Sequence, residues 1–196
     1  MHTQSNEPDE RSLITRTLAG DDDAFAGLVQ LHQTTVYNIA YRMVGQRDTA
    51  QSLAQETFLR AFKALDTFNL NRPFGPWLYR IATNLSINWI KRKRPPTVSI
   101  ETPAGFDETE SEPLDIPDSS AEPAEHFAQM EMQAELRQAI LLLPAEYRSV
   151  IELRHFQELN YDEIASALKI PVGTVKTRLF RARRMLRDRL ESRNKK

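Results

Sequence analysis

The residues best suited to chemistry lie near the C-terminus, where threonine, phenylalanine and arginine recur at helical spacing. From Lys169 to Lys196 the sequence has eleven Lys or Arg, opposed only by Asp188 and Glu191. Arginine pairs with guanine edges, and a threonine methyl or an aromatic ring can touch a thymine methyl. The indicated chemistry is therefore non-covalent recognition of nucleic acid. The residues that fall on this polar face are Thr174, Thr177, Phe180, Arg181 and Arg184.

A helix-turn-helix would position these side chains. The pattern predicts a short helix from about Tyr161 to Leu168, a turn at Lys169 to Pro171, and then a longer helix, whose start suits Pro171. Its opposite face is apolar at helical spacing, through Val172, Val175, Leu179, Ala182, Leu186 and Leu190. The alternative is an ordinary surface helix with a solvated basic face. The segregated charge and the aromatic Phe180 on the polar side favour nucleic acid.

A second basic patch spans Leu70 to Arg94, which contains six basic residues and no acid. Phe68 and Phe74 flank a loop, and a helix is predicted from Trp77 to about Lys93. Aromatic rings interleaved with base are typical of single-strand binding, where stacking contributes about 1–3 kcal/mol per base. On that helix Arg80, Asn84 and Lys91 should lie opposite Leu78, Ile81 and Leu85. Asn84 is either a base-edge reader or a solvated helix residue.

Composition and motifs argue against several other classes of protein, namely metalloproteins, secreted or membrane proteins, and enzymes. The 196-residue chain has a net charge of only −1, and acid and base are segregated along it. It has no cysteine, and its four histidines show no ligand spacing, so we expect no disulfide, no metal site and no other cofactor. The acidic N-terminus is unlike a signal peptide, no apolar run could span a bilayer, and we expect a cytoplasmic protein. No nucleophile–base pair or phosphate loop indicates an enzyme.

The remaining pattern predicts an all-α protein of two small helical domains, an N-terminal bundle and a C-terminal helix-turn-helix domain. After a polar tail, Met1 to about Arg11, helices are expected from the acidic cap Asp21–Asp23 to Gly45 and from Asp48 to Phe68. The second should bury Leu53, Phe58, Leu59, Phe62 and Leu65. Further helices are expected from Phe127 to Leu143 and from Pro144 to Gln157. The predicted domains are 1–95 and 127–196.

Between them, residues 96–126 have the composition of a flexible acidic linker. From Pro95 to Glu125 there are six prolines, nine acidic residues and no Lys or Arg. Two interpretations remain open. The segment is either a solvating spacer or a negatively charged strand that occupies a groove meant for nucleic acid.

These strings resemble a known family. Leu143-Pro-Ala-Glu-Tyr-Arg, Leu159-Asn-Tyr-Asp-Glu-Ile-Ala and Ile170-Pro-Val-Gly-Thr-Val-Lys-Thr-Arg-Leu-Phe-Arg resemble region 4 of bacterial sigma factors of the sigma-70 family, extracytoplasmic-function (ECF) type. Gln55-Glu-Thr-Phe-Leu-Arg-Ala-Phe and Phe74-Gly-Pro-Trp-Leu-Tyr-Arg-Ile-Ala-Thr-Asn-Leu resemble region 2. The resemblance implies a non-enzymatic subunit that lends promoter recognition to core RNA polymerase.

The resemblance also implies a role for each segment. The C-terminal recognition helix would read the −35 element, and Lys176 joins its candidate contacts. The −10 element would be read and opened near Phe68, Arg72, Trp77, Arg80, Asn84, Asn88 and Lys91. The β′ clamp helices of polymerase would bind Asp48, Gln55, Glu56, Leu59 and Arg60, and the β flap and an anti-sigma factor are further implied partners.

The chain departs from the family pattern at a few positions. Gln51 and Ser52 stand where more acid is usual, Lys169 stands where glycine is common, and Gly75-Pro76 is unusual in the −10 loop. A conventional helix-turn-helix regulator, with an N-terminal sensing or dimerisation module, is the competing interpretation. Both interpretations include the helix-turn-helix, so only the first module can distinguish them. A sensing module would need an apolar pocket and would lack a basic, aromatic loop.

Overall fold

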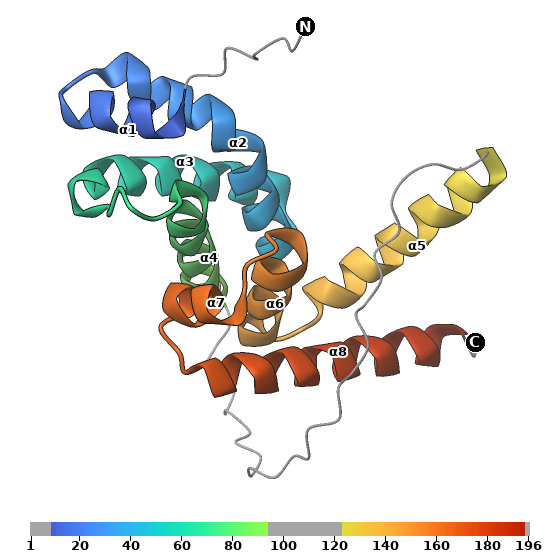
Figure 1. Cartoon of the computed structure of the whole chain (residues 1–196). Coiled ribbons are helices and arrows are strands. Elements are labelled where there is room, and N and C mark those ends of the chain that lie inside the picture. The colour runs from blue at the N-terminus through green and yellow to red at the C-terminus, as the bar shows by residue number, and fades with distance from the viewer. Residues whose placement is uncertain (1–8, 94–122, 195–196) are drawn as a thin grey trace, which may run out of the picture. The chain divides into compact units, whose positions relative to one another are not determined.

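The computed structural model describes residues 9–93 and 123–194, with the backbone alone for 123–131 and 193–194 (Figure 1). All regular elements in these ranges are helical, as predicted. They divide into two compact units, one built from residues up to Ser86 with Ser166–Lys169, the other from Ile87–Ala165 with Ile170 onward. Residues 1–8 of the predicted tail and 96–122 of the predicted linker lie outside the described residues.

The first unit begins with α1 (Glu10–Leu18), a helix that the sequence analysis did not predict. The Asp9 carboxylate accepts a hydrogen bond from the Arg11 backbone N–H at 3.3 Å and caps the first turn. Leu13 and Ile14 are buried where α1 packs against α2. Placing Glu10 and Arg11 in a polar tail was therefore wrong, because a single apolar pair suffices to anchor so short a helix.

Helix α2 (Asp22–Val44) follows the predicted bounds. The Asp21 carboxylate accepts from the Ala24 N–H at 3.2 Å, and Gly45 ends the helix at a left-handed φ of 75°. A residue with a Cβ would be strained in that conformation, which is why glycine suits it. Leu28, Val36 and Ile39 are fully buried on the inner face of α2.

Helix α3 (Arg47–Lys63) ends earlier than predicted, and a 3-10 turn η1 (Leu65–Thr67) follows it. The predicted buried stripe was partly wrong: Leu53 and Leu65 are buried, but Leu59 is 57% and Phe62 45% exposed. Small residues take the inner face, which consists of Ala50, Leu53, Ala54, Thr57 and Ala61. They allow α2 and α3 to pack closely, so the larger apolar side chains beside them remain outside.

Helix α4 (Phe74–Lys93) begins one turn before the predicted start at Trp77. Pro76 therefore lies within the first turn, where a missing N–H costs nothing. Phe74, Leu78, Ala82 and Leu85 form its buried stripe.

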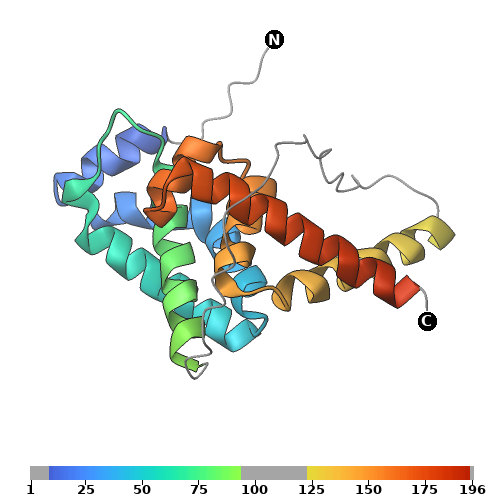
Figure 2. The same cartoon turned by 90° about the horizontal axis from the view of Figure 1, so that it is seen from below.

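The second unit contains α5 (Pro123–Leu141), α6 (Ala145–Ile151) and a π-helical turn η2 (Glu152–Phe156). Helix α5 begins at Pro123, inside the segment predicted as linker. Figure 2 shows the long helix α8 (Val172–Asn194), which packs against both α5 and α6. The buried Arg148 guanidinium donates to the backbone carbonyls of Leu141 and Leu143, the latter at 2.8 Å, and so satisfies the open end of α5.

Candidate nucleic-acid interface

Helix α7 (Tyr161–Leu168) has a well-defined start and end. The Asn160 N–H donates to Glu163 Oε2 at 2.8 Å, and the Glu163 N–H donates to Asn160 Oδ1 at 3.0 Å, a reciprocal capping box. At the other end Lys169 adopts a left-handed φ of 54°, and the Ile170 N–H donates to the Ala165 carbonyl at 3.1 Å. The predicted turn at Lys169 is present, and its left-handed conformation costs lysine about 1–2 kcal/mol relative to glycine. The tight turn sends the chain directly into α8.

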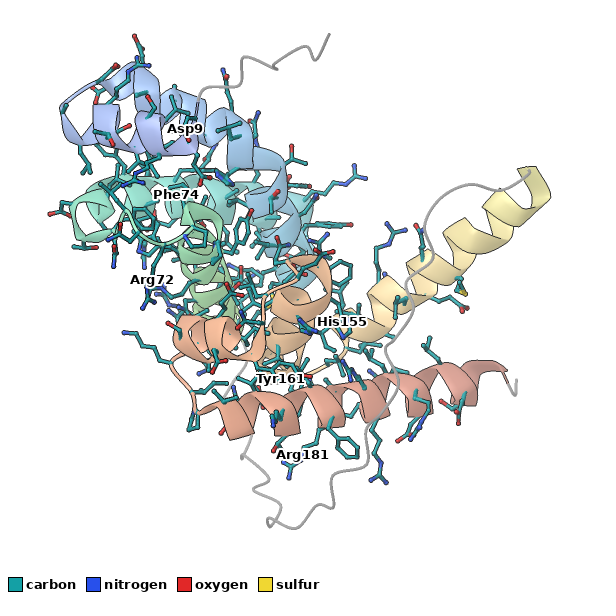
Figure 3. The ribbon with its side chains drawn as sticks, in the orientation of Figure 1. Asp9, Arg72, Phe74, His155, Tyr161 and Arg181 are labelled. Carbon is teal, nitrogen blue, oxygen red and sulfur yellow. The ribbon has the colours of Figure 1, made fainter. Side chains whose placement is uncertain are left out.

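Helix α8 has the two faces predicted from its sequence. Val175, Leu179, Ala182 and Leu186 are buried, whereas Val172 and Leu190 are half-buried. On the other side Lys176, Thr177 and Arg184 are exposed, and Thr174, Phe180 and Arg181 are half-buried. Figure 3 shows Arg181 on the side of α8 turned away from α6. The six candidate residues for duplex contact therefore lie outside the apolar seam.

Two candidate residues on α8 already have neighbours within the helix. The Thr177 hydroxyl donates to the Gly173 carbonyl at 2.9 Å, which leaves its methyl group as the outward feature. Arg184 Nε lies 3.9 Å from the Asp188 carboxylate, and both side chains are more than half exposed. Such an exposed pair is weak, so a phosphate could replace Asp188 as the partner of Arg184.

Beside the seam, His155 of η2 faces Arg183 of α8. The guanidinium of Arg183 donates to His155 Nε2 at 3.5 Å, which requires a neutral imidazole. Burial, and then the charges of Arg183 and Arg154, lower the pKa of His155 below its usual 6.5. This contact was not predicted, because two residues so far apart in sequence give no local pattern.

The phenylalanines flanking the predicted −10 loop are packed inside the first unit. Phe68 is 9% and Phe74 1% exposed. Their ring centroids lie 5.4 Å apart, and the Trp77 ring lies 5.2 Å from Phe68 and 5.4 Å from Phe74. We call these three rings the aromatic cluster. Trp77 is half-buried and is the most accessible ring of the cluster. Phe68 is buried, so it supports the loop from inside and does not face solvent.

The other −10 candidates mostly follow one stripe of α4. Trp77, Arg80, Asn84, Asn88 and Lys91 are spaced by three or four residues, which places them on one side of the helix. Asn88 and Lys91 are exposed, Arg80 and Asn84 are half-buried, and Arg72 is exposed in the loop before α4 (Figure 3). The stripe begins with the aromatic ring of Trp77 and continues with cationic and amide side chains. Single-strand binding uses the same combination of stacking and basic groups.

The polymerase-binding candidates share the outer face of α3. Asp48, Gln55, Leu59 and Arg60 are exposed and Glu56 is half-buried, with Glu56 Oε1 2.7 Å from Arg60 Nε. Phe62 belongs with them but was predicted to be buried. It lies edge-on to Phe25 of α2, with centroids 4.9 Å apart, and keeps its outer edge exposed. An apolar centre with a charged rim is the usual composition of a protein interface.

Sequence reasoning also missed a polar contact between α1 and α2. His32 Nε2 donates to Glu10 Oε1 at 2.7 Å, and the imidazole stands beside Phe74 and Tyr79 of α4. The absence of a predicted α1 hid this contact, since Glu10 had been placed in the tail.

Residues 9–93 and 123–194 contain neither a membrane-spanning helix nor a metal cluster. None of their helices combines the length and apolar character needed to cross a bilayer. Within the same ranges no three histidine or acidic side chains gather as a metal site would require.

Comparisons with known proteins agree with this geometry. Residues 28–95 match the family description Sigma-70 region 2, and residues 133–186 match Sigma-70, region 4. The chain is 41% identical over 177 residues to the ECF RNA polymerase sigma factor SigW of Bacillus subtilis, covering 90% of this chain and 94% of that protein. It is 35% identical to the RNA polymerase sigma-H factor of Pseudomonas aeruginosa, with 93% and 94% covered.

Solved structures share the fold. The structure of CnrH in complex with the cytosolic domain of CnrY aligns with a TM-score of 0.63 at 24% identity, covering 93% of this chain and 97% of that chain. The sigma factor RpoE of Bartonella quintana, solved with the anti-sigma factor NepR, aligns with a TM-score of 0.60 at 21% identity, covering 85% and 96%.

The α8 helix has a basic outward face, α4 has an aromatic and basic stripe, and two family regions match in this order; together these findings lead to one conclusion. The chain belongs to the ECF sigma factors of the sigma-70 family, which direct promoter-specific transcription initiation.

Proposed function

We propose that this sigma factor binds core RNA polymerase, reads the −35 element as duplex with α8, and helps to open the −10 element with α4 and the loop before it. The single observation that carries the proposal is the division of α8 into a buried apolar seam and an outward face of threonine, phenylalanine and base. Such a helix can enter a major groove while its seam holds it on the domain.

At −35, the six candidate residues divide into those that contact bases and those that contact phosphates. Arg181 pairs with a base edge, and Thr177 presents its methyl group to a thymine because its hydroxyl is engaged by Gly173. Phe180 and Thr174 add apolar contact, while Lys176 and Arg184 neutralise phosphates. Each neutralised phosphate steepens the salt dependence of binding by about 0.9 in the log–log slope.

At −10, the aromatic cluster forms the floor on which an unstacked base is trapped. Trp77 supplies the accessible ring, Phe68 and Phe74 hold it, and Asn84 reads the base edge, with Arg80 beside it. Arg72, Asn88 and Lys91 attract the backbone of the exposed strand. Contacts to the open strand thereby offset an unstacking cost of a few kcal/mol.

The outer face of α3 is the proposed docking surface for the β′ clamp helices, with Leu59 at its centre and Asp48, Gln55, Glu56 and Arg60 around it. The C-terminal domain docks on the β flap. An anti-sigma factor is a further proposed partner, and the complex of the Bartonella relative with NepR supports it. We place the protein in the cytoplasm with the polymerase and assign it no covalent chemistry and no cofactor.

The domain limits proposed from the sequence, 1–95, 96–126 and 127–196, suit this division of labour. Sigma-70 region 2 ends at residue 95 and region 4 begins at residue 133. A conventional regulator with an N-terminal sensor is disfavoured, because region 2 occupies the place such a sensor would take.

The test is transcription by purified core polymerase with this protein, from a template that carries both promoter elements and from templates that lack one. We expect co-purification with core and transcripts only from the complete promoter. Arg181→Ala should weaken −35 recognition and change base preference there. If core does not bind the protein, the proposed function is wrong. If Arg181→Ala leaves promoter choice unchanged, the residue assignment alone is wrong.

A further inference from the structure

A polar pair joins the first two helices at the base of the proposed −10 site. His32 Nε2 of α2 lies 2.7 Å from Glu10 Oε1 of α1. The carboxylate can only accept, so the imidazole carries its proton on Nε2 and donates it. The His32 side chain is 12% exposed and that of Glu10 38% exposed, so this hydrogen bond is shielded from water on the side of His32.

The imidazole of His32 also contacts the first turns of α4. Its ring centroid lies 5.5 Å from Phe74 and 6.1 Å from Tyr79. Contact with two rings, together with a directional hydrogen bond, allows His32 few orientations. The ring is therefore a fixed support against which α4 begins.

Tyr79 is held in the same group of residues. Its hydroxyl is hydrogen-bonded to Thr35 of α2, and burial followed by the charge of Glu10 raises its pKa. A Cβ on Gly75 would lie 3.2 Å from three atoms of the Tyr79 side chain. Gly75, unusual for the family pattern, thus lets the tyrosine lie over the first turn of α4.

Phe74 is the member of the aromatic cluster that His32 contacts, and it packs against the other two members, Phe68 and Trp77. A continuous series of contacts therefore leads from Glu10 through His32 and Phe74 to Trp77. Every member lies in the first unit. None of these four residues is among those proposed for polymerase binding or for −35 contact.

We propose that Glu10 and His32 are positioning residues for −10 opening: they fix Phe74, and through it the ring of Trp77, so that promoter opening depends on α1. The inference rests on the proposed function of α4. It assigns a role to a helix that precedes the region 2 match, which begins at residue 28. Loss of the pair should slow opening while polymerase binding and −35 binding persist.

The experiment compares full-length variants in holoenzyme. Glu10→Ala and His32→Gln break the pair or remove the ring, and Glu10→Gln keeps an acceptor for the imidazole. The matched control is Arg16→Gln, because Arg16 and Asp21 form an exposed ion pair between α1 and the start of α2, at 2.6 Å. Binding to core and formation of the closed complex are measured separately from the rate of −10 opening, followed by a fluorescent base.

We expect Glu10→Ala and His32→Gln to slow opening by about tenfold, with Glu10→Gln close to wild type and Arg16→Gln unchanged. In a Trp89→Phe background, the emission of Trp77 should shift for the same two variants alone. Opening at the wild-type rate in His32→Gln would overturn the proposal, as would equal losses in core binding and opening. If the unaltered protein fails to transcribe with core, the proposed function fails instead.

Discussion

At the scale of single residues, a side chain's hydrogen bonds decide what remains for recognition. Thr177 is exposed on the face of α8 proposed for −35 contact, but its hydroxyl donates to the Gly173 carbonyl at 2.9 Å. A hydroxyl satisfied within its own helix has no energetic need of a base edge. The outward methyl group is therefore the feature that we propose for DNA contact.

Thr177→Val should retain −35 binding within about twofold, since it keeps the methyl group in the same place. Thr177→Ala should weaken binding by roughly 1 kcal/mol, or about fivefold, when the −35 contact is a thymine methyl. Titration of holoenzyme on a labelled duplex measures both. A loss in Thr177→Val as large as that in Thr177→Ala would show instead that the hydroxyl turns toward the DNA.

His155 carries the pH dependence that the second unit is expected to show. Its neutral ring accepts from Arg183, so protonation would remove an acceptor and set two cations together. Burial, then Arg183 and Arg154, hold the folded pKa below 6.5, the unfolded value. As pH falls through 6.5 the unfolded chain binds the proton first, so folding stability present above 6.5 is lost below it.

His155→Gln should flatten this dependence, because glutamine keeps an acceptor for Arg183 but does not titrate near neutrality. The free energy of unfolding, measured by denaturant titration from pH 7.5 downward to about pH 5, should fall less steeply in the variant. Arg183→Gln should give an intermediate slope. Parallel curves for wild type and His155→Gln would assign the pH dependence to other groups.

At the scale of whole helices, α3 presents apolar residues on two faces with different tasks. The inner face uses alanine, threonine and one leucine to pack closely on α2. The outer face carries Leu59 and Phe62, both exposed, beside the Glu56–Arg60 ion pair. The sequence pattern assigned the large apolar residues of α3 to one buried stripe. Helical periodicity shows where hydrophobic residues recur, but it does not show how closely the neighbouring helix packs.

Leu59→Ala should lower affinity for core polymerase by about tenfold or more, as truncation of an interface anchor does. Its effect on the free energy of unfolding should stay near 0.5 kcal/mol, as is usual for surface positions. Leu53→Ala is the matched contrast, since Leu53 lies on the inner face and should cost about 2–5 kcal/mol of stability. Titration of core by fluorescence anisotropy and denaturant unfolding give the two quantities. Unchanged core affinity in Leu59→Ala would place the docking surface elsewhere.

At the scale of the whole molecule, the two surfaces proposed for DNA contact belong to one chain. The proposed −10 and −35 faces lie on α4 and α8, and residues 96–126 between the domains carry acid and proline without Lys or Arg. Covalent connection makes the second contact intramolecular, with an effective concentration set by the length of chain between the two surfaces.

Cleavage at a protease site introduced within 96–126 should therefore reduce complex formation on a promoter bearing both elements by about 100-fold. The uncut protein with the same insertion is the control, and a template bearing only −10 should be affected much less. Mobility shifts of holoenzyme before and after cleavage measure the change. Equal complex formation by cut and uncut protein would mean that polymerase alone keeps both domains in place.

The sequence by itself determined several features that depend on neighbours along the chain. The α2 cap at Asp21, the end of α2 at Gly45, and the helix-turn-helix with its turn at Lys169–Pro171 are all local, so spacing and residue type predicted them. The apolar seam of α8 followed from periodicity for the same reason. The family, and with it the order of the two regions, followed from motifs that are contiguous strings.

Only the tertiary structure decided which side chains meet across helices. It buried Phe68 and Phe74 together, left Leu59 and Phe62 outside, and brought Glu10 to His32 over a separation of 22 residues. Burial depends on the shape of the opposing surface, and a long-range hydrogen bond depends on the packing of both helices. The periodicity of a single segment predicts neither the burial of a side chain nor a long-range hydrogen bond. For this reason α1 and its contact with α2 were not predicted.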